Sequence, residues 1–175
     1  APYSTAREIY RRCAAESFNR SIATHWLESA DEVEFLQTGQ GPIRRFLSSI
    51  GAWVEGAAPI NDPWETLLPE GKWTLVHGNY VVLDDLNRWL GAGKNRSIAA
   101  IVYCPRTHAH FGHPPHPWEK LLAAGIPVAL GTDSLASNPD LSVWNDARWL
   151  VERGADPKQV LQMLTEFGAA ALGFE

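Results

Sequence analysis

Three residues that can bind a metal ion occupy corresponding places in the sequence. His25, His77 and Asp133 each follow a short run of residues that is typical of a β-strand. Because a (β/α) barrel gathers its catalytic groups at the C-terminal ends of its strands, this placement predicts one shared site. Imidazole and carboxylate groups suit Zn²⁺ or Fe²⁺, and a catalytic ion keeps one position open for water. One such residue alone is more often a loop anchor, so the interpretation depends on all three.

Glu28 is a candidate for proton transfer at the same site. It lies three residues after His25, so its carboxyl group can return to the pocket as the chain leaves the strand. A carboxyl group whose pKa is raised by burial can act as a general acid and base. The alternative is an exposed glutamate in an acidic stretch, because Asp31, Glu32 and Glu34 follow closely.

A loop rich in proline and glycine, expected after the third strand, contains four histidines: His108, His110, His113 and His116. Such a tract can bind a metal, but a loop at the catalytic face can equally line a substrate pocket. We take His108 and Ser134 as candidates for substrate binding. Arg106 is a further candidate for an anionic or carbonyl group, with a loop-bracing salt bridge as an equal alternative.

The elements that must position these residues alternate between β-rich and amphipathic helical segments, which is typical of βα units around a parallel sheet. Strands are predicted at residues 21–25, 73–77, 98–103 and 126–130. Helices are predicted at residues 5–18, 31–37, 42–50, 84–90, 116–124, 140–153 and 157–171, with a loop rich in Gly, Pro and Asn before the second strand. Thr5 and Glu8 have capping-box spacing, and Pro127 is expected near the start of the last strand. The sequence predicts an α/β fold with a single domain over residues 1–175.

The composition narrows the classes of partner. Of the 175 residues 45% are hydrophobic, enough for one sizeable core. The net charge of −5 and the absence of long basic runs argue against nucleic-acid binding. Cys13 and Cys104 are the only cysteines and form no close pair, so no disulfide framework is indicated. No stretch approaches the roughly 18 apolar residues of a membrane span, and a cytoplasmic protein that binds a small molecule is expected.

Together these motifs resemble the amidohydrolase superfamily, in the branch of metal-dependent deaminases and chlorohydrolases that holds cytosine deaminase-like and triazine hydrolases. The resemblance covers the whole chain and depends on the order of short motifs: Ala1-Pro2-Tyr3-Ser4, His25-Trp26-Leu27-Glu28, His77-Gly78, Cys104-Pro105-Arg106, Gly131-Thr132-Asp133-Ser134 and Ala169-Ala170-Ala171-Leu172-Gly173. It implies a (β/α)8 TIM barrel, of which this chain is roughly the second half, strands five to eight with their helices.

The resemblance also implies a role for each site residue. His25 would bind the metal, Asp133 would bind it and take a proton from its water, and Glu28 would pass a proton to the leaving nitrogen. His77 would orient or polarise the substituent of the attacked carbon. The implied reaction is hydrolysis of a C–N bond other than a peptide bond, as in deamination of an aminated purine, pyrimidine or related heterocycle. Glu28 favours deamination over chloride displacement, because branch members that displace chloride can lack this acid; a triazine chlorohydrolase is the alternative.

The sequence departs from the family pattern in one respect. Family members carry a His-x-His pair on strand one, and His108-Ala109-His110 is in the wrong place to supply it. We therefore expect strands one to four to be missing, the single Zn²⁺ or Fe²⁺ ion to be weakly bound or absent, and activity alone to be little or none. The expected partners are a heterocyclic substrate and the missing N-terminal half, or further copies in a homo-oligomer. A different class of function is a non-catalytic half-barrel that acts only in association.

Overall fold

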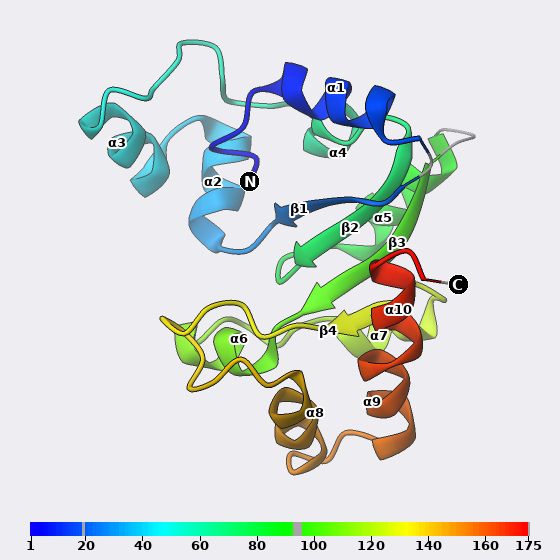
Figure 1. Cartoon of the computed structure of the whole chain (residues 1–175). Coiled ribbons are helices and arrows are strands. Elements are labelled where there is room, and N and C mark those ends of the chain that lie inside the picture. The colour runs from blue at the N-terminus through cyan, green and yellow to red at the C-terminus, as the bar shows by residue number, and fades with distance from the viewer. Residues whose placement is uncertain (19, 93–95, 175) are drawn as a thin grey trace.

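A parallel sheet organises the computed structural model, which describes residues 1–18, 20–92 and 96–174. Its strands run in the order β1-β2-β3-β4, and every neighbouring pair is parallel (Figure 1). The strands are β1 Ile22–Trp26, β2 Gly71–His77, β3 Arg96–Tyr103 and β4 Val128–Leu130. The four predicted strands are thus confirmed, and Pro127 directly precedes β4. Within the described residues β1 and β4 form the two edges of the sheet.

The helices before β2 are α1 Arg7–Glu16, α2 Ala30–Thr38, α3 Gly41–Ser49 and α4 Pro63–Leu67. Those after it are α5 Leu83–Ala92, α6 Pro105–Phe111, α7 Trp118–Ala123, α8 Val143–Val151, α9 Pro157–Leu164 and α10 Glu166–Ala171. In the described part of the chain no helix has the length and apolar character needed to cross a bilayer.

Two of these helices, α4 and α6, lie where the sequence predicted loops. Each begins with a proline in its first turn, where the missing N–H has no helical partner to lose. The helix predicted at residues 157–171 is divided, because Thr165 ends α9 and also precedes α10. The loop predictions failed because these helices are short, with five residues in α4 and seven in α6, and show no full apolar period.

The start of α1 corrects a second expectation. Its N-cap is Ala6, which makes no side-chain capping hydrogen bond, so Thr5 and Glu8 do not form the predicted capping box. Thr5 lies one residue too early for its hydroxyl group to cap the first turn. In α2, by contrast, Ser29 accepts a hydrogen bond from the backbone N–H of Glu32.

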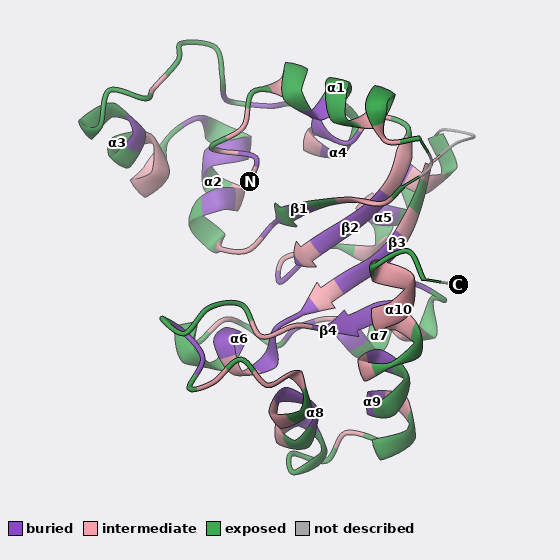
Figure 2. Cartoon of the chain, in the orientation of Figure 1, coloured by how far each residue is buried: buried purple, intermediate pink, exposed green. Residues whose placement is uncertain are grey.

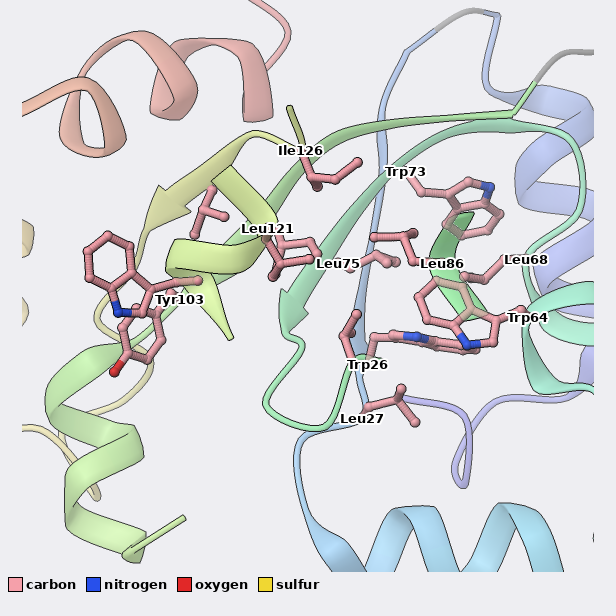
Figure 3. Close-up of a cluster of buried hydrophobic side chains, with 14 of the residues drawn as sticks. Trp26, Leu27, Trp64, Leu68, Trp73, Leu75, Leu86, Tyr103, Leu121 and Ile126 are labelled. Atoms are coloured by element: carbon pink, nitrogen blue, oxygen red, sulfur yellow. The ribbon is translucent and has the colours of Figure 1, made fainter. Parts of the chain in front are cut away.

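The hydrophobic core, part of which is shown in Figure 3, contains five buried tryptophans: Trp26, Trp64, Trp73, Trp89 and Trp118. The ring of Trp64 in α4 lies 5.1 Å from that of Trp26 in β1 and 5.8 Å from that of Trp89 in α5, between ring centroids. Trp73 of β2 is fully buried in the same cluster. Large aromatic side chains dominate the energetics of such cores. Because Trp26 directly follows His25, this packing gives the end of β1 a rigid base.

The two faces of the sheet contact different helices. Leu75 of β2 is buried in the core with Leu86 of α5. The next side chain along, Thr74, points to the other face and donates a hydrogen bond from Oγ1 to the carbonyl of Ala171 in α10, at 3.2 Å. On the edge strand β1 the burial alternates, and His25 is exposed (Figure 2). The described structure therefore leaves His25 on an open surface.

Candidate metal centre

His25, His77 and Asp133 converge at the C-terminal ends of the strands. One ligand atom from each lies within 4.8 Å of the other two. The centroids of the two imidazole rings are 5.3 Å apart. His25 and Asp133 are exposed, whereas His77 is only 2% exposed. Three separate βα units thus bring two imidazoles and one carboxylate to a single point.

Backbone conformation directs these side chains as much as strand register does. Trp26 of β1 pairs with His77 of β2, so strict alternation would place His77 on the face opposite His25. Instead His77 has a φ of 71°, and its ring lies beside that of His25. Asp133 has a φ of 59°, and Leu27, just before Glu28, has a φ of 48°. Such strained residues cluster at functional sites, and three of the four described non-glycine residues with positive φ lie here.

Two glycines beside the site residues allow a close approach to β3. A Cβ atom on Gly131 would lie 2.7 Å from Cγ1 of Val102, and one on Gly78 would lie 2.8 Å from Cγ2 of Ile101. Both distances are shorter than side chains tolerate. The glycines after β2 and β4 are therefore needed for the loops that carry His77 and Asp133 to pack against the sheet.

Glu28 reaches the same point from the loop after β1. Its Oε1 lies 3.5 Å from Nε2 of His77. Burial lowers the pKa of His77 to about 4, an effect that Asp133 opposes and His25 reinforces, so the imidazole is neutral at neutral pH. Burial also raises the pKa of Glu28, against the opposing effect of His25. The contact is therefore between a neutral imidazole and a carboxyl group that is suited to carry a proton.

Nε2 of His77 is a buried nitrogen for which the described residues provide no hydrogen-bond partner. A buried polar atom without a partner is costly in a folded protein. Because this atom lies beside Glu28, at the point where the candidate ligands converge, an external ligand there would satisfy it. The donor set of two imidazoles and a carboxylate fits Zn²⁺ or Fe²⁺.

The backbone of Glu28 is held from two sides. The side chain of Asn79 donates a 2.8 Å hydrogen bond to its carbonyl. The carboxylate of Glu32 accepts hydrogen bonds from the backbone N–H groups of Leu27 at 3.1 Å and Glu28 at 3.0 Å. Glu32 is fully buried, and burial raises its pKa to about 7 although these N–H groups lower it. Neither Asn79 nor Glu32 was singled out from the sequence, since neither falls in a recognised motif.

Two of the four clustered histidines hold the loops of the site in place. Nε2 of His116 donates a 2.9 Å hydrogen bond to the carbonyl of His77, and its ring stacks on Tyr103 at 4.0 Å. Burial lowers the pKa of His116 to about 3, so it stays neutral. His108, a candidate for substrate binding, is buried and donates from Nε2 to the carbonyl of Pro114 at 2.9 Å.

The other two histidines differ from this pair. His110 is exposed. Nδ1 of His113 lies 3.3 Å from the hydroxyl oxygen of Tyr80, and the His113 side chain lines a cavity together with Glu28. His113 therefore lies beside Glu28, at the open side of the candidate centre.

The carboxylate of Asp133 is oriented by Ser137, which the sequence analysis missed. Oγ of Ser137 donates a 3.0 Å hydrogen bond to Oδ2 of Asp133. Ser137 is buried with Thr107, and their hydroxyl oxygens are 3.1 Å apart. Ser134, a candidate for substrate binding, is exposed on the same loop. A serine four residues after a candidate ligand, in a turn, is a sequence signal that could have identified Ser137.

Arg106 braces the loop that follows Asp133. Its guanidinium group donates to Asp140 Oδ1 at 2.7 Å and to Asp146 Oδ2 at 2.9 Å. Asp146 is fully buried and also accepts a hydrogen bond from Asn138 at 3.1 Å. The two carboxylates raise the pKa of Arg106, Asp140 most strongly. These contacts are those of the loop-bracing alternative, and they occupy the guanidinium group that was a candidate for substrate binding.

The fold and the site together define a partial (β/α) barrel with a candidate metal centre at its strand ends. A family described as the amidohydrolase family matches residues 1–175. The chain belongs to the amidohydrolase family, and its sheet is part of the TIM barrel of that family.

Relatives of this chain are longer than it is. An aminodeoxyfutalosine deaminase from Deinococcus radiodurans is 31% identical over 188 residues, which cover 98% of this chain and 44% of that protein. The chain therefore spans less than half the length of this relative.

Solved structures show the same fold. An aminofutalosine deaminase from Helicobacter pylori, in complex with methylthio-coformycin, has a TM-score of 0.77 at 20% identity. The match covers 98% of this chain and 44% of the deaminase chain. An atrazine chlorohydrolase from Arthrobacter aurescens, complexed with zinc, has a TM-score of 0.63 at 24% identity. This match covers 95% of this chain and 35% of the chlorohydrolase chain.

Proposed function

We propose that this chain provides one half of a metal-dependent deaminase that hydrolyses the exocyclic C–N bond of an aminated purine, pyrimidine or related heterocycle. The observation that carries the proposal is the convergence of His25, His77 and Asp133 within 4.8 Å, with Glu28 3.5 Å from His77. A relative named as a deaminase, which aligns over 98% of this chain, supports it. The other half of the barrel would come from strands that this chain does not contain; we call the polypeptide with both halves the complete protein.

His25 and Asp133 are the proposed ligands of one Zn²⁺ or Fe²⁺ ion. Such an ion, when bound, supplies a water that is acidic enough to ionise near neutral pH. Because the two proposed ligands are exposed and do not complete a tetrahedral site, we propose that the chain alone holds the ion weakly and has little or no activity. The further ligands that a tetrahedral site needs would come from the other half.

The proposed chemistry of the chain's own residues concerns protons. Deamination adds water to the C=N bond of the ring carbon and then breaks the bond between this carbon and the amino group. One proton must therefore reach the leaving nitrogen. Glu28 is the proposed carrier of that proton, because burial raises its pKa. Asp133, oriented by Ser137, accepts a proton from the attacking water. His77 is neutral, and the described residues give its Nε2 no hydrogen-bond partner; it orients or polarises the substituent of the attacked carbon.

A second candidate is a non-catalytic half-barrel that functions only in association. The observation in its favour is that β1 and β4 are both sheet edges in the described structure, and open edges are sites of pairing. A third, chlorohydrolase activity on a triazine, shares the fold, but Glu28 supplies an acid that family members displacing chloride can lack.

The test is a screen of the complete protein, loaded with Zn²⁺ or Fe²⁺, for ammonia release from aminated purines, pyrimidines and triazines. Chloride release from chlorotriazines is measured in parallel. We expect ammonia release, its loss in Asp133→Ala, and little or none from the 175-residue chain alone. Chloride release without ammonia would establish the chlorohydrolase instead. An Asp133→Ala protein with full activity would overturn the mechanism, and a stable metal-free dimer of this chain, together with an inactive complete protein, would establish the half-barrel module.

A further inference from the structure

The segment Leu27-Glu28 connects the end of β1 to Ser29, the N-cap residue of α2 (Figure 1). Leu27 has a φ of 48°, in the left-handed region that a leucine rarely adopts. Because Glu28 follows directly, the conformation of Leu27 sets the direction in which the Glu28 side chain leaves the backbone. Such a conformation persists only where the surrounding structure holds it. The contacts of this segment therefore decide where the carboxyl group of Glu28 lies.

Every polar backbone atom of Leu27 and Glu28 has a hydrogen-bond partner outside the segment. Their two N–H groups donate to Oε1 and Oε2 of Glu32, at 3.1 and 3.0 Å. The carbonyl of Leu27 accepts from the backbone N–H of Tyr80 at 3.2 Å, and the carbonyl of Glu28 accepts from the side chain of Asn79 at 2.8 Å. The segment is thus fixed on its N–H side by one carboxylate and on its carbonyl side by the loop after β2.

Glu32 departs from the usual role of a glutamate in the first turn of a helix. The hydroxyl group of Ser29 accepts from the backbone N–H of Glu32 at 3.2 Å, which is one half of a capping box. In the other half of that motif, the glutamate accepts from the N–H of the N-cap residue. The carboxylate of Glu32 instead accepts from the N–H groups one and two residues earlier. It is also fully buried, which is costly for a carboxylate unless hydrogen bonds compensate it.

We infer that Glu32 is a positioning residue for the proposed proton transfer, because it holds the segment that directs the carboxyl group of Glu28. The inference rests on the proposed function, which takes Glu28 to be the proton carrier. In this role Glu32 acts through Glu28 and does not contact the substrate. Oε1 of Glu28 lies 3.5 Å from Nε2 of His77, and a displacement of about 1 Å at a catalytic group can lower a rate about 10²-fold. Loss of Glu32 should therefore lower kcat and leave KM and metal content nearly unchanged, since the proposed metal ligands lie outside the segment.

The test is a double-mutant cycle on ammonia release by the complete protein at pH 8, where Glu32 is ionised because its pKa is about 7. Glu32→Gln keeps the size of the side chain but removes its charge and one of its two acceptor oxygens. We expect kcat to fall about tenfold or more, with KM changed less than about twofold. Adding Glu32→Gln to Glu28→Gln should cause no further fall, because the two residues act as a unit.

Two more variants complete the cycle. Glu34→Gln is the matched control, because Glu34 is exposed on the same helix. Glu32→Asp keeps the charge but is one methylene shorter, so it should show the same loss of kcat, and it replaces Glu32→Gln if that variant does not fold.

A second measurement needs no activity. Hydrogen exchange of the Leu27 and Glu28 amides, followed by NMR in the 175-residue chain, should accelerate roughly 10- to 100-fold in Glu32→Gln, because hydrogen bonds to a charged acceptor are lost. The amide of Leu75, in the middle of β2, should keep its protection, since the change is local.

The outcomes separate this inference from the proposed function. Equal kcat in Glu32→Gln and wild type, or losses that multiply in the double variant, would overturn the inference while the deaminase stands. Exchange that accelerates equally at Leu75 would also overturn it, because the effect would then be global. If wild type releases no ammonia, the proposed function fails and the catalytic role of Glu32 fails with it; faster exchange confined to Leu27 and Glu28 would still show that Glu32 holds the segment.

Discussion

Oε1 of Glu28 lies 3.5 Å from Nε2 of His77, although the two residues belong to successive βα units. The imidazole is neutral because burial lowers its pKa to about 4, and burial raises the pKa of the carboxyl group. The structure thus places a neutral imidazole beside a carboxyl group whose pKa is raised. Four predictions follow from this geometry and from the contacts that support it.

Glu28→Gln should abolish most catalysis while leaving the metal in place. Glutamine keeps the shape of the side chain but cannot carry the proton, and general acid–base catalysis contributes roughly 10²- to 10⁴-fold. We expect kcat for ammonia release by the complete protein to fall by about that factor, with unchanged metal content by elemental analysis. Glu34→Gln is the matched control, because Glu34 is exposed in the same acidic stretch. Equal activity of Glu28→Gln and wild type would remove Glu28 from the mechanism.

Ser137→Ala should weaken metal binding. The substitution removes the 3.0 Å hydrogen bond that orients the carboxylate of Asp133. Residues that orient a ligand from behind typically contribute about 10- to 100-fold to metal affinity. The Kd for Zn²⁺ of the complete protein, measured by competition with a chelator, should rise by that factor, and Ser137→Thr should restore part of it. Ser97→Ala, an exposed position on β3, serves as the control. An unchanged Kd would show that Asp133 needs no support from Ser137.

Asp146→Ala should destabilise the fold. Asp146 is fully buried, and its removal leaves the nearly buried guanidinium group of Arg106 with only the partly exposed Asp140 as a carboxylate partner and leaves the side chain of Asn138 without its bond to Asp146. Breaking a buried pair in this way costs about 3 to 5 kcal/mol. Urea unfolding of this chain, followed by tryptophan fluorescence, should show a loss of that order. Asp140→Ala removes the other carboxylate that contacts Arg106. The side chain of Asp140 is 42% exposed, so the loss of stability should be clearly smaller. Equal losses would mean that burial does not decide the strength of the brace.

Glu32 should make the stability of this chain fall as the pH rises. Burial raises its pKa in the folded state to about 7 from the ordinary value of 4.5, so unfolding releases a proton between these values. The stabilisation is complete below about pH 4.5 and is lost as the pH passes 7, by about 3 kcal/mol in all. Urea unfolding at pH 5 and pH 8 should show this decrease in wild type and a smaller one in Glu32→Gln, which cannot titrate. The same decrease in both proteins would assign it to another group.

Much of the fold could be predicted from local pattern. The apolar runs that become β1 to β4 and the periodic segments that become most of the helices are visible in the sequence, because burial on one side repeats with the period of the element. The helices α4 and α6 were missed since each has fewer than eight residues and lies among prolines and glycines. The expected capping box at Thr5 failed because a spacing motif does not fix where the first turn begins.

The sequence by itself determined which residues could do chemistry. His25, Glu28, His77 and Asp133 were identified from residue type and from their place after predicted strands, and the order of motifs identified the family. These are properties of short segments, and short segments can be read in isolation.

Only the tertiary structure decided how those residues meet. The positive φ at His77 and Asp133, the hydrogen bond from Ser137 and the occupation of Arg106 by two aspartates depend on residues that are distant along the chain. A strained backbone conformation persists only where the surrounding contacts hold it, and a buried charge is stable only beside its partners. Such contacts form between elements after they pack, so no local pattern contains them.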